Sequence, residues 1–254
     1  MRVLLGAMRV QVEITRRNMM DYYWVLLVPF FALIFMAVLV ESGRRDLLGY
    51  ALVGPLLVGL GQMGFYVASE VVSRDVGSQT LELEIATPAS FPLVIASRTI
   101  LLTSLSLVGF VESWLIARLA FGVSIEVHHP GVLAATLVCT IFAAGATALI
   151  TSALFSLSRS ARAMQNTVTY PLYVLSGVLV PASYLPNWLE PVSKVLFLSW
   201  AADLMRDSLS AQPVDDLVPR LLVVAGLGAG ALALGTLLLN RMIDRLRADG
   251  RLGL

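Results

Sequence analysis

Residues 47–69 read LLGYALVGPLLVGLGQMGFYVAS and contain no Asp, Glu, Lys or Arg. A helix needs about 20 mainly apolar residues to cross a hydrocarbon core of roughly 30 Å, so this stretch is long enough for one crossing. The chain of 254 residues is 57% hydrophobic and 14% charged, with a mean hydropathy of +0.82. This composition excludes an ordinary soluble domain and predicts an integral membrane protein.

Further apolar runs predict an all-α integral membrane protein with six transmembrane helices in a single domain, 1–254. Residues 92–120 are counted as a span although Arg98 and Glu112 interrupt them. Arg98 is expected to snorkel to the inner interface. The predicted spans are 22–40, 47–69, 92–120, 131–157, 163–181 and 220–241.

Residues 1–21 predict an amphipathic helix lying on the membrane surface. On a helical wheel, its charged side chains gather within an arc of about 100°. The length and charge of this region argue against a cleavable signal peptide. The members of the charged arc are Arg2, Arg9, Glu13, Arg16 and Arg17, and the opposite face carries Leu4, Met8, Val12 and Met19.

The distribution of basic residues predicts the orientation. With the amino terminus inside and six spans, the inner side carries twice as many Lys and Arg residues as the outer side. Both termini and residues 70–91 are then cytoplasmic. The net charge of +1 points to no charged partner, and no nucleic-acid partner is expected.

Two regions near the carboxyl end depart from a plain span. Residues 182–210 predict short helices on or re-entering the outer face, because Pro181, Pro186 and Pro191 interrupt any continuous helix. In the last span, four glycines predict a small-residue face for close packing. They are Gly226, Gly228, Gly230 and Gly235.

Residues 69–90 read SEVVSRDVGSQTLELEIATPAS and are too polar to lie in lipid. The part after Ser69, which we call the polar segment (residues 70–91), carries four acids against the single base Arg74. Glu70 and Arg74 are four residues apart with the acid first, which favours a pair on a helix surface. A helical turn ending near Gly77 is expected. The polar segment is either a solvated loop or a surface that contacts a partner.

The chain resembles the permeases of type 2 ABC exporters. The resemblance rests on GSQTLELEIATPAS at residues 77–90, preceded by SEVVSRD, in which an acid and a base precede a Thr-Leu-Glu motif and a Leu-rich stretch ends in Thr-Pro. The outer stretch SGVLVPASYLPNWLEPVSKVLFLSWAADLMRDSL, residues 176–209, is similar to the family's pattern of Ser-Gly, Pro and Leu-Pro. These features and the amphipathic amino terminus follow the family's order.

The resemblance implies that residues 70–91 are a coupling segment in which Glu70 to Ile85 form a coupling helix that docks in a groove of a separate ATPase subunit. It further implies two ATPase copies that hold ATP and Mg²⁺, and a second permease chain forming a homodimer or a heterodimer, with membrane lipids around them. This chain has no GxxxxGK[ST] phosphate loop and is expected to bind no cofactor. The implied coupling residues are Glu70, Arg74, Asp75, Gly77, Thr80, Leu81, Glu82, Leu83 and Glu84.

Three residues within the spans are candidates for a pathway or gate: Glu112, Tyr170 and Tyr173. An ionisable residue in a span is a functional hypothesis by default, although Glu112 also lies near enough to the outer end to reach water. His128 and His129 are adjacent and lack further ligands, so they are expected to be surface residues rather than a metal site.

The leading hypothesis is the permease of an exporter in the bacterial plasma (inner) membrane, moving a drug, antibiotic, lipid or lipid-linked glycan. No Ser-His-Asp set or carboxylate pair predicts a catalytic site. Three alternatives stay open. They are a proton-driven secondary transporter with Glu112 as its carrier, a membrane-embedded enzyme, and a non-transporting immunity or sensor protein.

Overall fold

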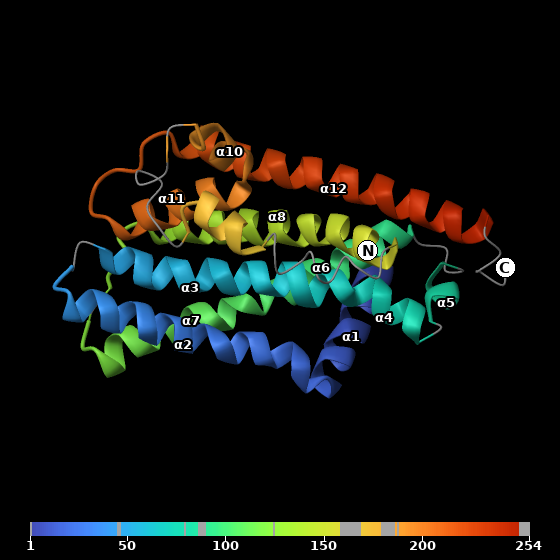
Figure 1. The fold of residues 1–254 in the computed structure, drawn as a ribbon, viewed down its shortest axis with the longest axis horizontal. Helices are drawn as coiled ribbons and strands as arrows, with labels where there is room; N and C mark the ends of the chain where they lie inside the picture. Colours follow the sequence, from blue (N-terminus) through green and yellow to red (C-terminus); the bar gives the residue numbers. More distant parts are fainter. Residues whose placement is uncertain are drawn as a thin grey trace.

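The computed structural model describes residues 2–44, 47–78, 80–85, 90–123, 125–157, 169–178, 186 and 188–248. Every regular element in these residues is helical, as Figure 1 shows. The elements are α1 (Arg2–Arg17), α2 (Met19–Glu41), α3 (Leu48–Gln62), α4 (Val71–Gly77), α5 (Leu81–Ile85), α6 (Phe91–Ser104), α7 (Ser106–Ala120), α8 (Pro130–Leu157), α10 (Glu190–Val195), α11 (Phe197–Leu209) and α12 (Leu217–Ala248), with a further helical stretch over 169–175.

The helices form an elongated bundle with two distinct ends (Figure 1). Helices α2, α3, α8 and α12 run along the long axis, and α10 and α11 lie at one end. Helices α1, α4 and α5 lie at the other end, together with the last turns of α12. The amino-terminal helix and the polar segment therefore share one end of the bundle, opposite the helices predicted for the outer face.

Within the part of the chain that the structure describes, four helices are long and apolar enough to cross a membrane, and they match four predicted spans. They cover Leu48–Gly77, Phe91–Ala120, Pro130–Phe155 and Leu217–Ala248. The predicted first span corresponds to α2, of which Leu26–Glu41 forms a shorter apolar helix. Residues 163–168 and 179–181 of the predicted span 163–181 lie outside the described residues, so the six-span count stays a prediction.

Helix α3 lies in the middle of the bundle, and all its residues from 51 to 62 are buried. The ring of Tyr173 packs directly on Gly61, where a Cβ atom would collide with the Tyr173 hydroxyl. That hydroxyl donates a hydrogen bond to the Val58 carbonyl at 3.2 Å. The glycine in α3 thus allows the stretch 169–178 to approach its backbone.

Helix α3 continues into α4 without leaving the helical path. A π-helical turn (Met63–Val67) and a 3-10 turn (Ala68–Glu70) connect them. At such turns some backbone carbonyls do not accept the hydrogen bond that a regular α-helix would give them, so they need another donor. The hydroxyl of Ser152 on α8 donates to the Ser69 carbonyl at 2.9 Å. The polar segment therefore begins as an extension of a buried helix, and not as a separate element.

Helix α12 packs along α8 through only part of its predicted small-residue face. A Cβ on Gly228 or Gly235 would lie within about 3 Å of α8 atoms, whereas one on Gly226 or Gly230 would meet nothing within 4 Å. The prediction of a single four-glycine face is therefore wrong for Gly226 and Gly230, which point away from α8.

Short helices α10 and α11 occupy the end of the bundle expected to face outward. Arg206 on α11 donates to the Gly177 carbonyl at 3.1 Å and to Asp203 at 2.7 Å, and it lies 4.3 Å from the centre of the Tyr50 ring. This one side chain joins α11 to α3 and to the end of the stretch 169–178. The structure has two helices within 190–209, their location on or re-entering the outer face stays a prediction, and residues 182–185 and 187 lie outside the described residues.

Candidate functional site

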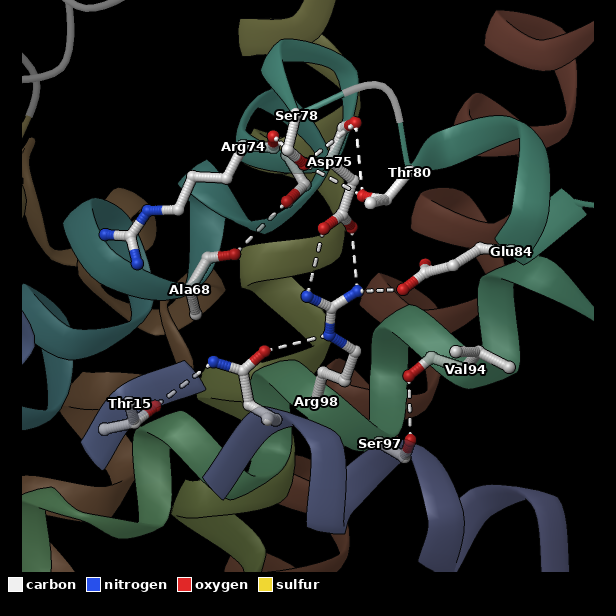
Figure 2. Close-up of polar contacts among 12 residues, drawn as sticks. Thr15, Ala68, Arg74, Asp75, Ser78, Thr80, Glu84, Val94, Ser97 and Arg98 are labelled. Carbon is white, nitrogen blue, oxygen red and sulfur yellow. Dashed lines mark hydrogen bonds and ion pairs between the residues drawn. The ribbon is translucent and has the colours of Figure 1, made fainter. Parts of the chain in front are cut away.

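One buried arginine, Arg98 on α6, holds the polar segment in place (Figure 2). Its Nη1 and Nη2 atoms donate to the two carboxylate oxygens of Asp75 at 2.7 and 3.1 Å. Nη1 also donates to Glu84 Oε1 at 2.6 Å, and Nε donates to Gln11 Oε1 at 2.8 Å. We call these four residues the Arg98 network. It joins four helices, α1, α4, α5 and α6.

The Arg98 network is closed to solvent at its centre. Arg98 is 2% exposed, Asp75 5% and Gln11 1%. A buried charge is tolerated when it is paired and hydrogen bonded, and the planar guanidinium matches a carboxylate with two parallel bonds. Gln11 in turn donates to the Thr15 hydroxyl at 3.2 Å on the same helix. The buried face of α1 is therefore polar and serves this contact.

Local turn chemistry brings the second carboxylate to Arg98. At the end of α4, the Ser78 hydroxyl donates to the Arg74 carbonyl at 2.9 Å, and the Thr80 amide donates to the Asp75 carbonyl at 3.0 Å. These bonds satisfy carbonyls that the end of a helix leaves open. The chain then turns into α5, which places Glu84 beside Asp75 (Figure 2).

Two carboxylates share one guanidinium, so the Arg98 network carries excess negative charge. Burial raises the pKa of Glu84. The guanidinium of Arg98 opposes this rise, while the charge of Asp75 adds to it. The net effect is a pKa of Glu84 above that of an ordinary glutamate. The folded protein therefore binds a proton at Glu84 more tightly than the unfolded chain does.

Replacing Glu84 with glutamine is expected to remove part of the pH dependence of stability. Because the pKa is raised in the folded state, the stabilising contribution is complete at acidic pH and is lost as pH rises through the raised pKa. Glutamine keeps an oxygen acceptor for Arg98 without the charge. Thermal unfolding in detergent would be measured from acidic to neutral pH. The unfolding temperature should fall less with rising pH in Glu84→Gln than in the unchanged protein. An unchanged slope of stability against pH in Glu84→Gln would contradict the prediction, and Glu70→Gln, in a half-buried pair on the surface, serves as the control.

The structure divides the predicted coupling residues into inward and outward groups. Asp75 and Glu84 bind Arg98, and Leu81 is 4% exposed within the hydrophobic core. Glu70 and Arg74 form the predicted surface pair at 3.5 Å. Asp75 and Leu81 are therefore buried within this chain, whereas Glu84 binds Arg98 and keeps 23% of its side chain exposed.

The tip of the polar segment, at the end of the bundle, combines the predicted coupling residues Gly77 and Thr80 with Val76 and Ser78, which were not predicted. Val76 is 46% exposed, and Gly77, Ser78 and Thr80 are also exposed. We call these four residues the apex. The predicted coupling residues Glu82 and Leu83 lie in α5, but their side chains are outside the described part of the structure.

Two members of the Arg98 network were not recognised in the sequence. Arg98 reaches toward the end of the bundle that is predicted to be cytoplasmic, but its guanidinium is buried against Asp75 and does not extend into water as snorkelling would require. Gln11 had no predicted role, since it lies between apolar residues of an amphipathic helix. The polar segment has four acids and only one base. This excess of acids was the sequence signal that could have indicated a buried basic residue on another helix.

The predicted pathway residues lie apart from the Arg98 network. Tyr173 is fully buried and packs on α3, whereas Tyr170 is 58% exposed. Glu112 lies on α7, which Figure 1 shows toward the end of the bundle that holds α11. The two histidines bond backbone carbonyls near the end of α11: His128 to Leu209 at 2.9 Å, and His129 to Gln212 at 2.9 Å.

Comparison with known proteins assigns the chain to a family. The model of the ABC-2 type transporter family matches residues 3–209, while no curated protein matches the chain significantly. The matched range contains nearly all of α1, the polar segment, the Arg98 network, α10 and α11. It covers well over half of the 254 residues. The chain therefore belongs to the ABC-2 type transporter family and is a multi-pass ABC transporter permease.

Proposed function

We propose that this chain is the membrane-spanning subunit of an ATP-driven exporter in the bacterial plasma membrane, with both termini cytoplasmic. Its cargo is an amphiphile of the drug, antibiotic, lipid or lipid-linked glycan kind. Two copies of a separate ATPase subunit hold ATP and Mg²⁺, since this sequence has no phosphate-binding loop. Two permease chains, identical or different, enclose the pathway. Of the two tyrosine candidates, Tyr170 is the better placed to line this pathway, because its side chain is exposed.

The Arg98 network is the observation that carries this proposal. A segment that passes on a movement must itself be held firmly to the elements that it moves. The buried bonds of Arg98 fix α4 and α5 to α1 and α6. A displacement of the apex by an ATPase would therefore move these helices together.

The continuous helical path from α4 into α3 is a second connection through which movement of the apex would reach the bundle. Helix α4 continues α3 through the π-helical and 3-10 turns, and α3 runs buried through the middle of the bundle. Movement at the apex would reach α3 along the helix axis, and the irregular turns provide a place where the helix can bend. The apex thus connects to the pathway by a direct mechanical route.

The apex offers a surface suited to insertion into a groove of another protein. Val76 gives it an apolar contact, and a Cβ on Gly77 would meet nothing within 4 Å, so this side of the turn is open. The hydroxyls of Ser78 and Thr80 lie 2.9 Å apart and shape the turn. An ATPase groove would contact these small residues while the exposed pair of Glu70 and Arg74 flanks them.

Replacing Val76 with aspartate is expected to abolish ATPase binding while leaving the permease folded. A charge buried in the apolar centre of an interface typically costs more than 2 kcal/mol, or roughly 30-fold in affinity. The measurement is co-purification of the ATPase with the permease from membranes, with ATP hydrolysis in reconstituted vesicles. Val195→Asp is the matched control, because Val195 is 69% exposed at the opposite end of the bundle.

The same vesicles separate an ATP-driven exporter from a proton-driven transporter. Transport that requires ATP, and that Val76→Asp abolishes but Val195→Asp does not, supports the proposal. Transport driven by a proton gradient without ATP would overturn it. Normal ATPase co-purification with Val76→Asp would remove the apex from the interface.

A further inference from the structure

Glu112 is an acidic residue inside a membrane span. It lies on α7, within the candidate span Phe91–Ala120. Eight residues separate it from Ala120, which corresponds to about 12 Å along a helix. Ionisable residues at such depth are rare, and they generally face another charge, a cavity or a ligand.

No cationic side chain is available to Glu112 from the helices packed most closely on α7. These helices are α2 and α3, and neither contains Lys or Arg. The base on α7 itself, Arg118, lies 5.5 Å from the centre of the Trp114 ring. The Oε2 atom of Glu112 is buried and has no hydrogen-bond partner among the described residues. The carboxylate therefore lacks a counter-charge in the described structure.

On α7, Glu112 lies next to apolar residues that are exposed on the surface of the bundle. Its neighbours one turn away include Gly109, which packs against Val28 of α2, and Val108, which is 47% exposed. Leu115, one turn further along, is 41% exposed. Residues three and four positions apart lie side by side on a helix. The carboxylate thus sits at the seam between the packed face of α7 and its exposed apolar face.

A ligand that fits this seam must have an apolar body and a positive charge. We propose that Glu112 is a binding site for lipophilic cations that approach α7 from the bilayer. This inference rests on the proposed export function for its role, and it narrows the class of amphiphile that the permease takes. Attraction of opposite charges is strong at this depth because little water screens it.

The test measures binding of tetraphenylphosphonium to the purified full chain in phosphatidylcholine nanodiscs. Equilibrium dialysis should show about tenfold weaker binding to Glu112→Gln and little change in Glu112→Asp, which keeps the charge. Glu126→Gln, which removes an exposed acid outside the span, is the matched control. The neutral probe triphenylphosphine oxide should bind Glu112→Gln and the unchanged protein equally.

Equal binding of the cation to Glu112→Gln and the unchanged protein would overturn the inference, as would no binding to either. A change of oligomeric state in Glu112→Gln would overturn it as well, by assigning the carboxylate to a contact between copies. Should Glu112→Gln fail to fold, carbodiimide labelling of Glu112 in the unchanged protein must be slowed by tetraphenylphosphonium. These outcomes do not depend on ATPase co-purification, so failure of the export proposal is seen separately.

Discussion

Replacing Arg98 with alanine is expected to lower the free energy of unfolding by about 3–5 kcal/mol. The variant leaves the buried Asp75 and the partly buried Glu84 without a counter-charge, and Gln11 loses the donor that ties α1 to α6. Unfolding in mixed detergent and dodecyl sulfate micelles would measure the loss. Protein that stays folded should also lose ATP-dependent transport, because α4 and α5 are no longer fixed to α6.

The matched control for Arg98→Ala is Arg74→Ala in the same segment. Arg74 pairs with Glu70 at 3.5 Å, with both side chains 32% exposed. An exposed pair of this kind typically contributes less than about 1 kcal/mol. Adding Asp75→Asn to Arg98→Ala should recover part of the lost stability, because it removes one uncompensated buried charge. Equal losses from Arg98→Ala and Arg74→Ala would contradict the role assigned to the network.

The membrane spans were predictable because their signal is local. An uncharged run such as 47–69 can be recognised as a span because burying charge in lipid is costly, and this cost does not depend on which helices pack beside the run. The structure extends this run to Gly77, since the polar segment continues the same helix. Hydropathy marks where the lipid ends, but it does not mark where a helix ends.

The candidate site was predictable in position but not in geometry. Sequence spacing identified the Glu70–Arg74 pair, because i and i+4 residues always meet on a helix. It could not show that Asp75 turns inward, since its partner Arg98 lies 23 residues away on another helix. The contact with Gln11 spans 87 residues and depends on how α1 packs. Long-range pairs of this kind follow from tertiary packing, which no local pattern specifies.

The glycines of α12 show the same limit. Their spacing predicted one small-residue face, yet only Gly228 and Gly235 meet α8. Which side of a helix faces its neighbour depends on the rotation of that helix, and Gly226 and Gly230 lie on its open side. The two groups of glycines therefore provide a matched comparison within one helix.

Replacing Gly235 with leucine is expected to lower the free energy of unfolding by about 3 kcal/mol, the upper part of the range for overpacking. A Cβ there would lie 2.7 Å from Leu149 Cβ and 3.2 Å from the Ile150 backbone nitrogen. Because these atoms belong to or adjoin the α8 backbone, they cannot rotate away, and α12 must shift outward. Gly230→Leu, on the open side of the same helix, should change stability by less than about 0.5 kcal/mol. Detergent-resistant folded protein measured by size-exclusion chromatography after graded heating would compare the two. If Gly230→Leu destabilises the protein as much as Gly235→Leu, then the open side of α12 is itself covered in the purified protein, as it would be by a second permease chain.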